Sequence, residues 1–231
     1  MVDLIPLRKK FRYERLVRND DPSGRTYGEQ KLPSVTRILD ATKDKAKLDE
    51  WVQRVGQEEA DRIKNTAATT GTHMHSVIER MVAGKSLPRP TNWLMVKGYE
   101  MGYRLVIEQF KNIDEIWGSE VTLYVPTRYA GTTDMVGLYK GKPAIIDFKQ
   151  SNKPKRHEWI TDYFHQLSAY ALAHDTLFNT QIDMGVVMIA LQTGGTQVFT
   201  TTGHEFNQYK TGWLERVEQY YRNIVSNGNS L

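Results

Sequence analysis

The stretch GTTDMVGLYKGKPAIIDFK, residues 131–149, predicts a β-hairpin around which the rest of the chain is organised. Its residues alternate in character up to Leu138, and a turn follows at residues 139–142. The β-rich run Ala-Ile-Ile at residues 144–146 then begins the second strand. Alternation on both sides of a short glycine-containing turn is typical of two paired antiparallel strands.

The register of this hairpin places two acids opposite each other. A two-residue turn at Lys140–Gly141 would pair Asp134 with Asp147, with side chains roughly 5 Å apart on one face. Lys149 would share that face, because side chains alternate with a period of two. Two facing carboxylates repel unless a positive charge lies between them, and a hard divalent cation such as Mg²⁺ or Mn²⁺ supplies one. The spacing alone leaves open a surface hairpin with an incidental acidic pair.

Composition limits the classes of protein and of site. The 231 residues are 39% hydrophobic and 25% charged, which suits one domain with an elaborated core. The net charge of +4 permits a polyanionic partner without requiring one. The absence of cysteine excludes disulfides, thiolate zinc sites and cysteine-ligated iron–sulfur clusters. Without a long apolar run or a signal-peptide core, we expect a soluble cytoplasmic protein that does not bind membranes.

Hydrophobic periodicity and turn residues predict the remaining elements. We expect a basic N-terminal arm over residues 1–31, which could contact phosphates or could equally be a solvated terminus. Residues 32–231 are expected to form one domain, with a helical elaboration over about 32–112. The predicted elements are a helix starting near Ser34, helices over about 45–65, 69–82, 93–112, 158–178 and 205–226, and strands over about 116–125, 183–191 and 196–202.

The helix predicted from residue 69 carries a candidate metal ligand. His75 lies beside the core stripe of this helix, and Gly71 and Glu79, four residues to either side, share its face. A single histidine in such a place is usually structural, but its position ahead of the acidic hairpin fits a metal-ligating imidazole better. Glu120 lies in the strand before the hairpin. It could be a further acid near the site or, equally, a solvent-facing side chain.

Basic and polar residues follow the hairpin. Lys153, Lys155 and Arg156 lie in a polar loop, where a phosphate backbone would need neutralising. On the next predicted helix, Gln166 and Tyr170 are four residues apart and are therefore neighbours on one face.

These residues together predict metal-dependent phosphodiester chemistry. Asp134 and Asp147 could hold one or two divalent ions with His75, and such ions activate water and polarise a phosphoryl oxygen. Lys149 could orient and deprotonate the attacking water or stabilise the charge of the transition state. Each motif alone is weak, because GxxD or DxK often occurs by chance, but their order and spacings form a strong signal.

The ordered set of motifs resembles the RecB-like branch of the PD-(D/E)XK nuclease superfamily. The set comprises His75 on a helix, GTTD ending at Asp134, IDFK ending at Lys149, and QLSAY from Gln166 to Tyr170. Within that branch the chain looks most like the mitochondrial genome maintenance exonuclease group and its phage relatives. The shared stretches are LPSVTRIL from residue 32, GTHMHSVIE from residue 71 and IDFKQSNKPK from residue 146, so the resemblance extends from about residue 32 to 175.

The resemblance implies an α/β (α+β) fold with an αβββαβ, restriction-endonuclease-like core, in which helices flank a central mixed sheet and extra helices precede it. It implies metal ligation by His75, Asp134, Asp147 and the Phe148 carbonyl. The implied catalytic residues are Asp134, Asp147, Lys149, Gln166 and Tyr170, the last two positioning DNA or supporting the active centre. The residues expected to contact DNA are Gln150, Ser151, Lys153, Lys155, Arg156, Gln166 and Tyr170. Position 150 departs from the group, whose members tend to have a small hydroxyl residue there.

The function implied by the resemblance is metal-dependent hydrolysis of single-stranded DNA from free ends, for which we expect Mg²⁺ or Mn²⁺. We also expect the protein to be a monomer. Alternatives are an endonuclease or duplex-end exonuclease of the same superfamily, a non-catalytic DNA-binding module, and an unrelated helical binding protein. The intact Asp134, Asp147 and Lys149 argue against a pure binder. Asp3, Glu14 and the lack of serine enrichment argue against a mitochondrial transit peptide, so we expect a phage-encoded or bacterial protein.

Overall fold

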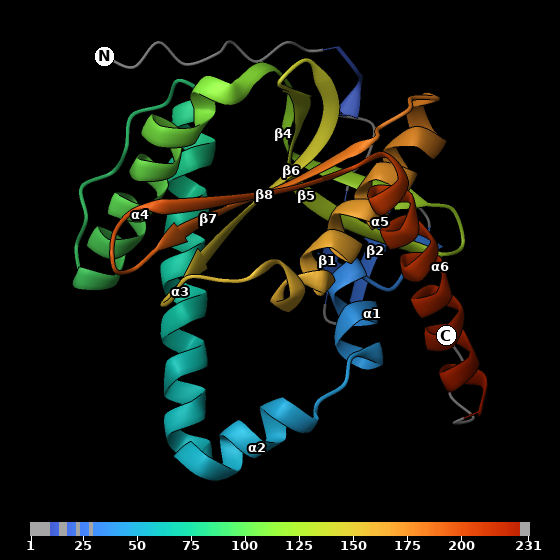
Figure 1. The fold of residues 1–231 in the computed structure, drawn as a ribbon, viewed down its shortest axis with the longest axis horizontal. Helices are drawn as coiled ribbons and strands as arrows, with labels where there is room; N and C mark the ends of the chain where they lie inside the picture. Colours follow the sequence, from blue (N-terminus) through green and yellow to red (C-terminus); the bar gives the residue numbers. More distant parts are fainter. Residues whose placement is uncertain (1–9, 14–17, 22–23, 28–29, 227–231) are drawn as a thin grey trace.

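A five-stranded mixed sheet forms the centre of the structure, a computed structural model that describes residues 10–13, 18–21, 24–27 and 30–226 (Figure 1). Its strands are β4 (Ile113–Val125), β5 (Tyr129–Tyr139), β6 (Lys142–Ser151), β7 (Met184–Leu191) and β8 (Thr196–Thr202), and they lie in that order. Neighbouring strands are antiparallel except β6 and β7, which are parallel and are connected through α5 (Thr161–Phe178). The predicted mixed sheet with flanking helices is confirmed.

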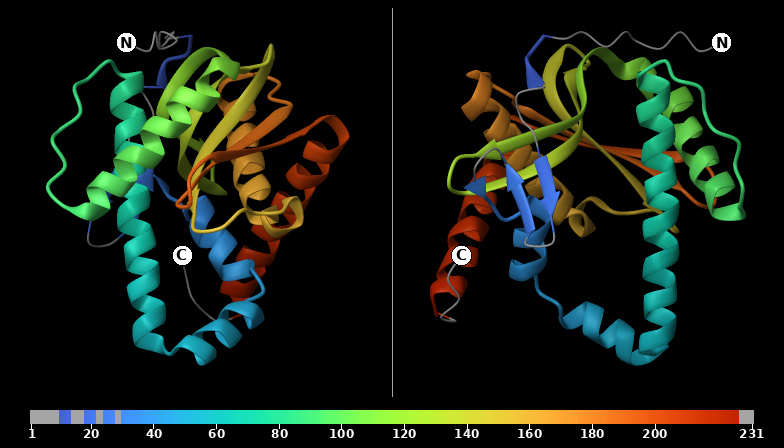
Figure 2. Two further views of the ribbon diagram at one scale, coloured as in Figure 1. Left: turned by 60° about the vertical axis from the view of Figure 1, so that its left-hand side comes forward. Right: turned by 180° about the vertical axis from the view of Figure 1, so that it is seen from behind.

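Helices cover both faces of this sheet (Figure 2). The others are α1 (Val35–Thr42), α2 (Ala46–Val55), α3 (Gln57–Val82), α4 (Trp93–Gln109) and α6 (Gly203–Ser226), with 3₁₀ turns η2 (Phe110–Asn112) and η3 (His157–Trp159). Helices α3 and α4 share one apolar core with the sheet, and α1, α5 and α6 share the other. Every residue of β7 is buried, as expected of a central strand with a parallel neighbour and both faces covered. None of the helices described has the length and apolar character to cross a membrane.

The N-terminal segment is described only in part. Arg8, Lys9 and Arg15 of the predicted basic arm lie outside the described residues. The described part contains a small antiparallel sheet of β1 (Arg18–Asp21), β2 (Gly24–Tyr27) and β3 (Gln30–Lys31). Phe11 and Tyr13 pack against the core on the α5 side, and the Tyr13 hydroxyl lies 2.8 Å from Nε2 of His174. This docking of residues 11–13 was not predicted from the sequence.

Two helix boundaries differ from the predictions. The prediction of one helix over 45–65 is wrong, because the helix is interrupted at Gly56. The φ of this residue, +86°, is readily adopted only by glycine. The separate helix start near residue 69 is also wrong, since α3 runs unbroken for 26 residues from Gln57 to Val82. Gly71 therefore lies inside a helix, where glycine costs about 1 kcal/mol relative to alanine. Packing of α3 against α4 and the sheet outweighs that cost.

The central hairpin has the predicted register. Met135 pairs with Ile146 and Tyr139 with Lys142, and the two residues between the strands, Lys140 and Gly141, both have positive φ, of 48° and 77°. This is the geometry of the two-residue turn that matches strand twist. Beyond the Met135–Ile146 pair, β5 continues along β4 and β6 continues along β7, so the two strands diverge. Asp134 and Asp147 are the first residues past the point of divergence.

Two glycines of α4 allow this helix to lie very close to α3. A Cβ atom on Gly102 would lie 2.7 Å from the Met74 carbonyl oxygen, and one on Gly98 would lie 2.5 Å from Cβ of His73. Both contacts fall at the two residues that precede His75 on α3. The close approach therefore fixes how α3, and the imidazole it carries, lies against α4.

Replacing Gly102 by alanine should destabilise the protein, although alanine is the better helix former. The new methyl group would meet backbone of α3 that cannot rotate away, and overpacking of this kind costs about 1–3 kcal/mol in the free energy of unfolding. Chemical denaturation measures the change. Glu100→Ala, at an exposed position of the same helix, should stay within about 0.5 kcal/mol of the unsubstituted protein. A Gly102→Ala protein as stable as this control would contradict the close packing.

Candidate active site

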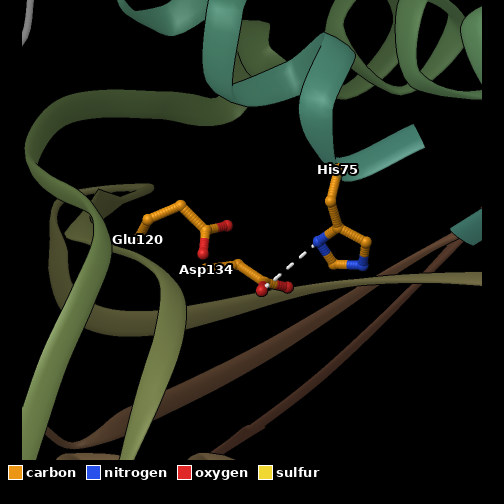
Figure 3. A group of neighbouring side chains, drawn as sticks. All are labelled: His75, Glu120 and Asp134. Carbon is orange, nitrogen blue, oxygen red and sulfur yellow. Dashed lines mark ion pairs between the residues drawn. The ribbon is translucent and has the colours of Figure 1, made fainter. Parts of the chain in front are cut away.

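The side chains predicted to act together meet where β5 and β6 diverge. Asp134 comes from β5 and His75 from α3, and Figure 3 shows both pointing into one space. The Nδ1 atom of His75 lies 3.4 Å from Oδ1 of Asp134. The other oxygen of Asp134 accepts the backbone N–H of Phe148 at 2.7 Å. Both oxygens of this carboxylate are thus held, one by a helix and one by the neighbouring strand.

Lys149 is fixed by three groups on the α5 side of the sheet. Its Nζ lies 2.5 Å from Oδ2 of Asp147 and donates to Oε1 of Gln166 at 3.2 Å. The same ammonium lies 5.1 Å from the centre of the Tyr163 ring. Tyr163 and Gln166 are three residues apart on α5 and therefore share a face. The sequence predicted Gln166 but missed Tyr163, although the same spacing could have identified it.

The ionisable groups of the site shift each other's pKa values in opposite directions. Asp147 is only 1% exposed, and burial raises its pKa to about 6, with Lys149 opposing the shift. Burial also acts on Asp134, but His75, Lys149 and the Phe148 N–H outweigh it and hold its pKa below the usual range. For Lys149, burial is outweighed by the carboxylates of Asp147 and Asp134, which raise its pKa. The lysine is therefore an ammonium ion at neutral pH.

Glu120 is the acid whose role the sequence left open, and the structure brings it to the site (Figure 3). The pairs on either side of it, Ser119 with Met135 and Val121 with Thr133, place Glu120 directly opposite Asp134. Its φ of 53° is uncommon for a residue with a side chain. The side chain is exposed to the cleft, yet partial loss of hydration and the charge of Asp134 raise its pKa to about 7.

A cleft of about 520 Å³ connects these side chains to solvent. Its walls combine His75, Glu120 and Asp134 with residues on one side of α3: Ala68, Gly71, Thr72, Ser76 and Glu79. Gly71 leaves the wall open, because the nearest atom to a Cβ placed there would be Cγ of Gln150 at 3.9 Å. The predicted neighbours of His75 therefore line the approach to the acids.

The donor set fits a hard divalent cation. One nitrogen of His75 and one oxygen each of Glu120 and Asp134 lie within 4.8 Å of one another. Atoms at that separation can share an ion with ligand distances of about 2.1 Å after small rotations, and oxygen-rich sets suit Mg²⁺ and Mn²⁺. Asp147 lies beside this group but is paired with Lys149. The N–H and C=O of one strand residue point to the same edge of the strand. Because the Phe148 N–H donates to Asp134, the Phe148 carbonyl also points toward β5.

Two predicted residues are buried and have structural contacts. Tyr170 is 2% exposed, and its ring lies against Gly131, where an added Cβ would lie 2.9 Å from Cε1 of the ring. Of the two roles predicted for Tyr170, its burial favours support of the active centre over contact with DNA. Ser151 is also buried, and its hydroxyl donates to the Lys153 carbonyl at 2.7 Å, which shapes the start of the loop.

The loop after β6 presents some of its predicted cations to solvent. Lys153 and Arg156 are exposed, whereas Lys155 is half-buried and its N–H donates to Oε1 of Gln197 at 2.7 Å. Gln150 points toward α3, and its Nε2 donates to the Ala67 carbonyl at 3.4 Å.

Replacing Asp134 by asparagine should lower the pKa of His75 in metal-free protein. Burial opposes protonation of this imidazole, and the Asp134 carboxylate outweighs burial, so the pKa of His75 is raised. Without that charge, burial and the Lys149 ammonium still lower the pKa of His75, and only the weaker effect of the Asp147 carboxylate opposes them. An NMR titration of the six histidines in EDTA measures the change. Glu79→Gln, on the cleft wall, is the control and should leave the His75 titration in place; an unchanged His75 in Asp134→Asn would contradict the pairing.

Comparison with known proteins identifies relatives by sequence. No protein-family model matches the chain. It is 28% identical over 201 residues to mitochondrial genome maintenance exonuclease 1 of Homo sapiens, and 28% identical over 206 residues to the Xenopus tropicalis protein of that name. Each alignment covers 82% of this chain but only 58% and 57% of those relatives, so the chain spans less than two thirds of their length.

A solved structure agrees with this relationship at the level of the fold. The chain is similar to a crystal structure from Eubacterium rectale described as a "putative exonuclease", with a TM-score of 0.52 and 14% sequence identity. The match covers 72% of this chain and 69% of that one. These similarities agree with the resemblance drawn from the motifs: the chain is similar in sequence to the mitochondrial genome maintenance exonuclease group, and its fold is similar to that of a protein described as a putative exonuclease.

Proposed function

We propose that the chain is a metal-dependent deoxyribonuclease that hydrolyses phosphodiester bonds of single-stranded DNA from free ends. The observation that carries this proposal is the convergence of His75, Asp134, Asp147 and Lys149 where β5 and β6 diverge. The relatives named exonucleases support a reaction that starts at ends. The preference for single strands rests on the motif resemblance.

Mg²⁺ or Mn²⁺ is the proposed cofactor. His75, Glu120 and Asp134 would hold the ion, with Asp147 and the Phe148 carbonyl as neighbouring donors. An ion held there supplies Lewis acidity toward the scissile phosphate. The oxygen-rich donor set and the cleft that leads to it support this assignment.

Lys149 would act as a fixed cation. Asp147 and Gln166 hold its ammonium in place, so no reorganisation is needed when charge develops on the phosphate. Because its pKa is raised, orientation of water and stabilisation of the transition-state charge are favoured over deprotonation of water. Gln166 and Tyr163 would serve as positioning residues for Lys149.

The proposal also includes the predicted domain organisation, oligomeric state and cellular location. The enzyme would act as a monomer through a nuclease domain over residues 32–231, with helices over about 32–112 as its elaboration and residues 1–31 as a basic arm. Exposed Lys153 and Arg156 support contacts with the DNA backbone. A cytoplasmic role in a phage-infected or bacterial cell stays a prediction from the sequence.

The decisive test compares end-labelled linear single strands, circular single strands and linear duplex in the presence of Mg²⁺. We expect cleavage of the linear single strand alone. Lys149→Ala should lower cleavage by about 100-fold or more, as expected for loss of a charge-stabilising donor, while DNA binding persists. Thermal melting verifies that this variant is folded. Lys111→Ala removes an exposed lysine of η2 and should leave cleavage unchanged.

Each other result has a definite meaning for the proposal. Cutting of the circle would assign an endonuclease. Full activity in Lys149→Ala would refute the role of the lysine. Absence of cleavage with both Mg²⁺ and Mn²⁺ would favour a DNA-binding module.

Asp147→Asn should weaken Mn²⁺ binding in a calorimetric titration by about 10- to 100-fold. Asparagine keeps the shape of the side chain but removes a negative charge beside the ion, and loss of groups around a metal site costs affinity on this scale. The matched control is Asp162→Asn, which removes an acid in the first turn of α5 that is paired with Arg216. This variant should bind Mn²⁺ as the unsubstituted protein does. An unchanged titration for Asp147→Asn would remove Asp147 from the metal site.

A further inference from the structure

Trp159 presents a large aromatic ring to solvent just before α5, the helix whose Tyr163 and Gln166 contact Lys149. It is 61% exposed and forms the last residue of η3, between the basic loop after β6 and the start of α5. The guanidinium carbon of Arg156 lies 5.2 Å from the centre of its ring. A cation so close to one side of an indole leaves the rest of the ring available for stacking.

The backbone around Trp159 is held firmly. Its N–H donates to the Arg156 carbonyl at 3.0 Å, and the next residue, Ile160, is only 1% exposed. The His157 ring lies 4.7 Å from the Phe164 ring, which anchors the other end of the turn. The exposed tryptophan therefore projects from a fixed turn, so a ligand that stacks on it orders little additional backbone.

The position of Trp159 suits a strand that reaches Lys149. Helix α5 begins two residues later, and its Tyr163 and Gln166 contact the lysine. The helix rises by about 8 Å from Thr161 to Gln166. In Figure 1 the gold segment that contains η3 passes between α3 and α1, above α2.

Trp159 also lines a polar cleft of about 490 Å³ together with the end of α1. The carboxylates of this cleft have cationic or N–H partners. Glu158 lies 4.0 Å from Arg156, Asp162 is paired with Arg216, and Asp44 accepts the N–H of Ala46 at 2.9 Å. Lys43, on the same cleft, pairs with Asp40 at 2.7 Å on α1. Repulsion of a phosphate backbone is thereby reduced.

We propose that Trp159, backed by Arg156, is a stacking platform for a base of the single-stranded DNA substrate. The inference rests on the proposed function and adds a binding site to it. Every base has a π-face, so such a platform holds a strand without reading its sequence. Trp159 would retain the strand next to Lys149 between successive cleavages.

The test is binding of fluorescent oligothymidylate to the full chain in EDTA, followed by anisotropy, so that no cleavage occurs. Trp159→Ala should bind about 5- to 150-fold more weakly, the range expected for loss of one base–aromatic stack. Trp159→Tyr should retain most of the affinity. Trp93→Ala is the matched control, because Trp93 is 59% exposed at the start of α4 with Lys97 at 5.0 Å. It should bind as the unsubstituted protein does.

An abasic oligonucleotide of equal length separates stacking from charge. The unsubstituted protein should bind it at least as weakly as Trp159→Ala binds oligothymidylate. The further loss in Trp159→Ala should be smaller than the loss in the unsubstituted protein, because the variant has already lost one stacking interaction. Unchanged binding by Trp159→Ala, an equal loss in Trp93→Ala, or full discrimination against the abasic strand in Trp159→Ala would each overturn the platform. If the unsubstituted protein still cleaves linear single strands with Mg²⁺ in those cases, the proposed function stands. A protein that neither binds nor cleaves would end both proposals.

Discussion

The hydrogen bond from the Phe148 N–H to the Asp134 carboxylate is the contact on which the site depends. A hairpin that stayed paired along its whole length would leave no opening between its strands. Separated strands expose backbone groups, and a buried N–H without a partner is costly. Asp134 supplies that partner at 2.7 Å, so β5 and β6 can diverge and β6 can join β7. The same contact fixes the carboxylate for His75 on one side and leaves room for Glu120 on the other.

Charge balance then determines how the remaining groups are arranged. Asp147 is buried beside Lys149, and burying either charge alone would cost several kcal/mol (about 3–5 when one partner of a buried pair is removed). Asp134 and His75 form a second pair nearer the cleft. Glu120 faces Asp134, and its pKa is raised first by partial loss of hydration and then by the like charge of Asp134. A divalent cation beside Glu120 and Asp134 would relieve the repulsion between the two carboxylates. The donor atoms and the charge balance therefore both favour a cation beside these two acids.

The features that could be predicted from the sequence are those that local patterns determine, such as the hairpin and its turn. Strand alternation and the Lys140–Gly141 turn specify the hairpin register, and the register brings Asp134 and Lys149 to one region. The break at Gly56 was missed, because a glycine can be tolerated inside a helix or can end it, and packing of distant elements decides which. The approach of Glu120 to the site depends on pairing between β4 and β5, and the contact of Tyr163 with Lys149 depends on how α5 lies on the sheet. Both are tertiary contacts that periodicity along one segment does not specify.

The completely buried strand β7 has a consequence for the newly made chain. Its sequence, MGVVMIAL, has no charge and strong β-propensity, the features of segments that associate with copies of themselves when exposed. During synthesis β7 follows β6 and α5, but β8 and α6, with the buried Phe206 and Trp213, emerge only afterwards. Until they do, one edge of β7 and part of one face are uncovered. In the folded structure β8 covers that edge and α6 packs on that face, so a truncation before β8 would leave the edge of β7 unpaired.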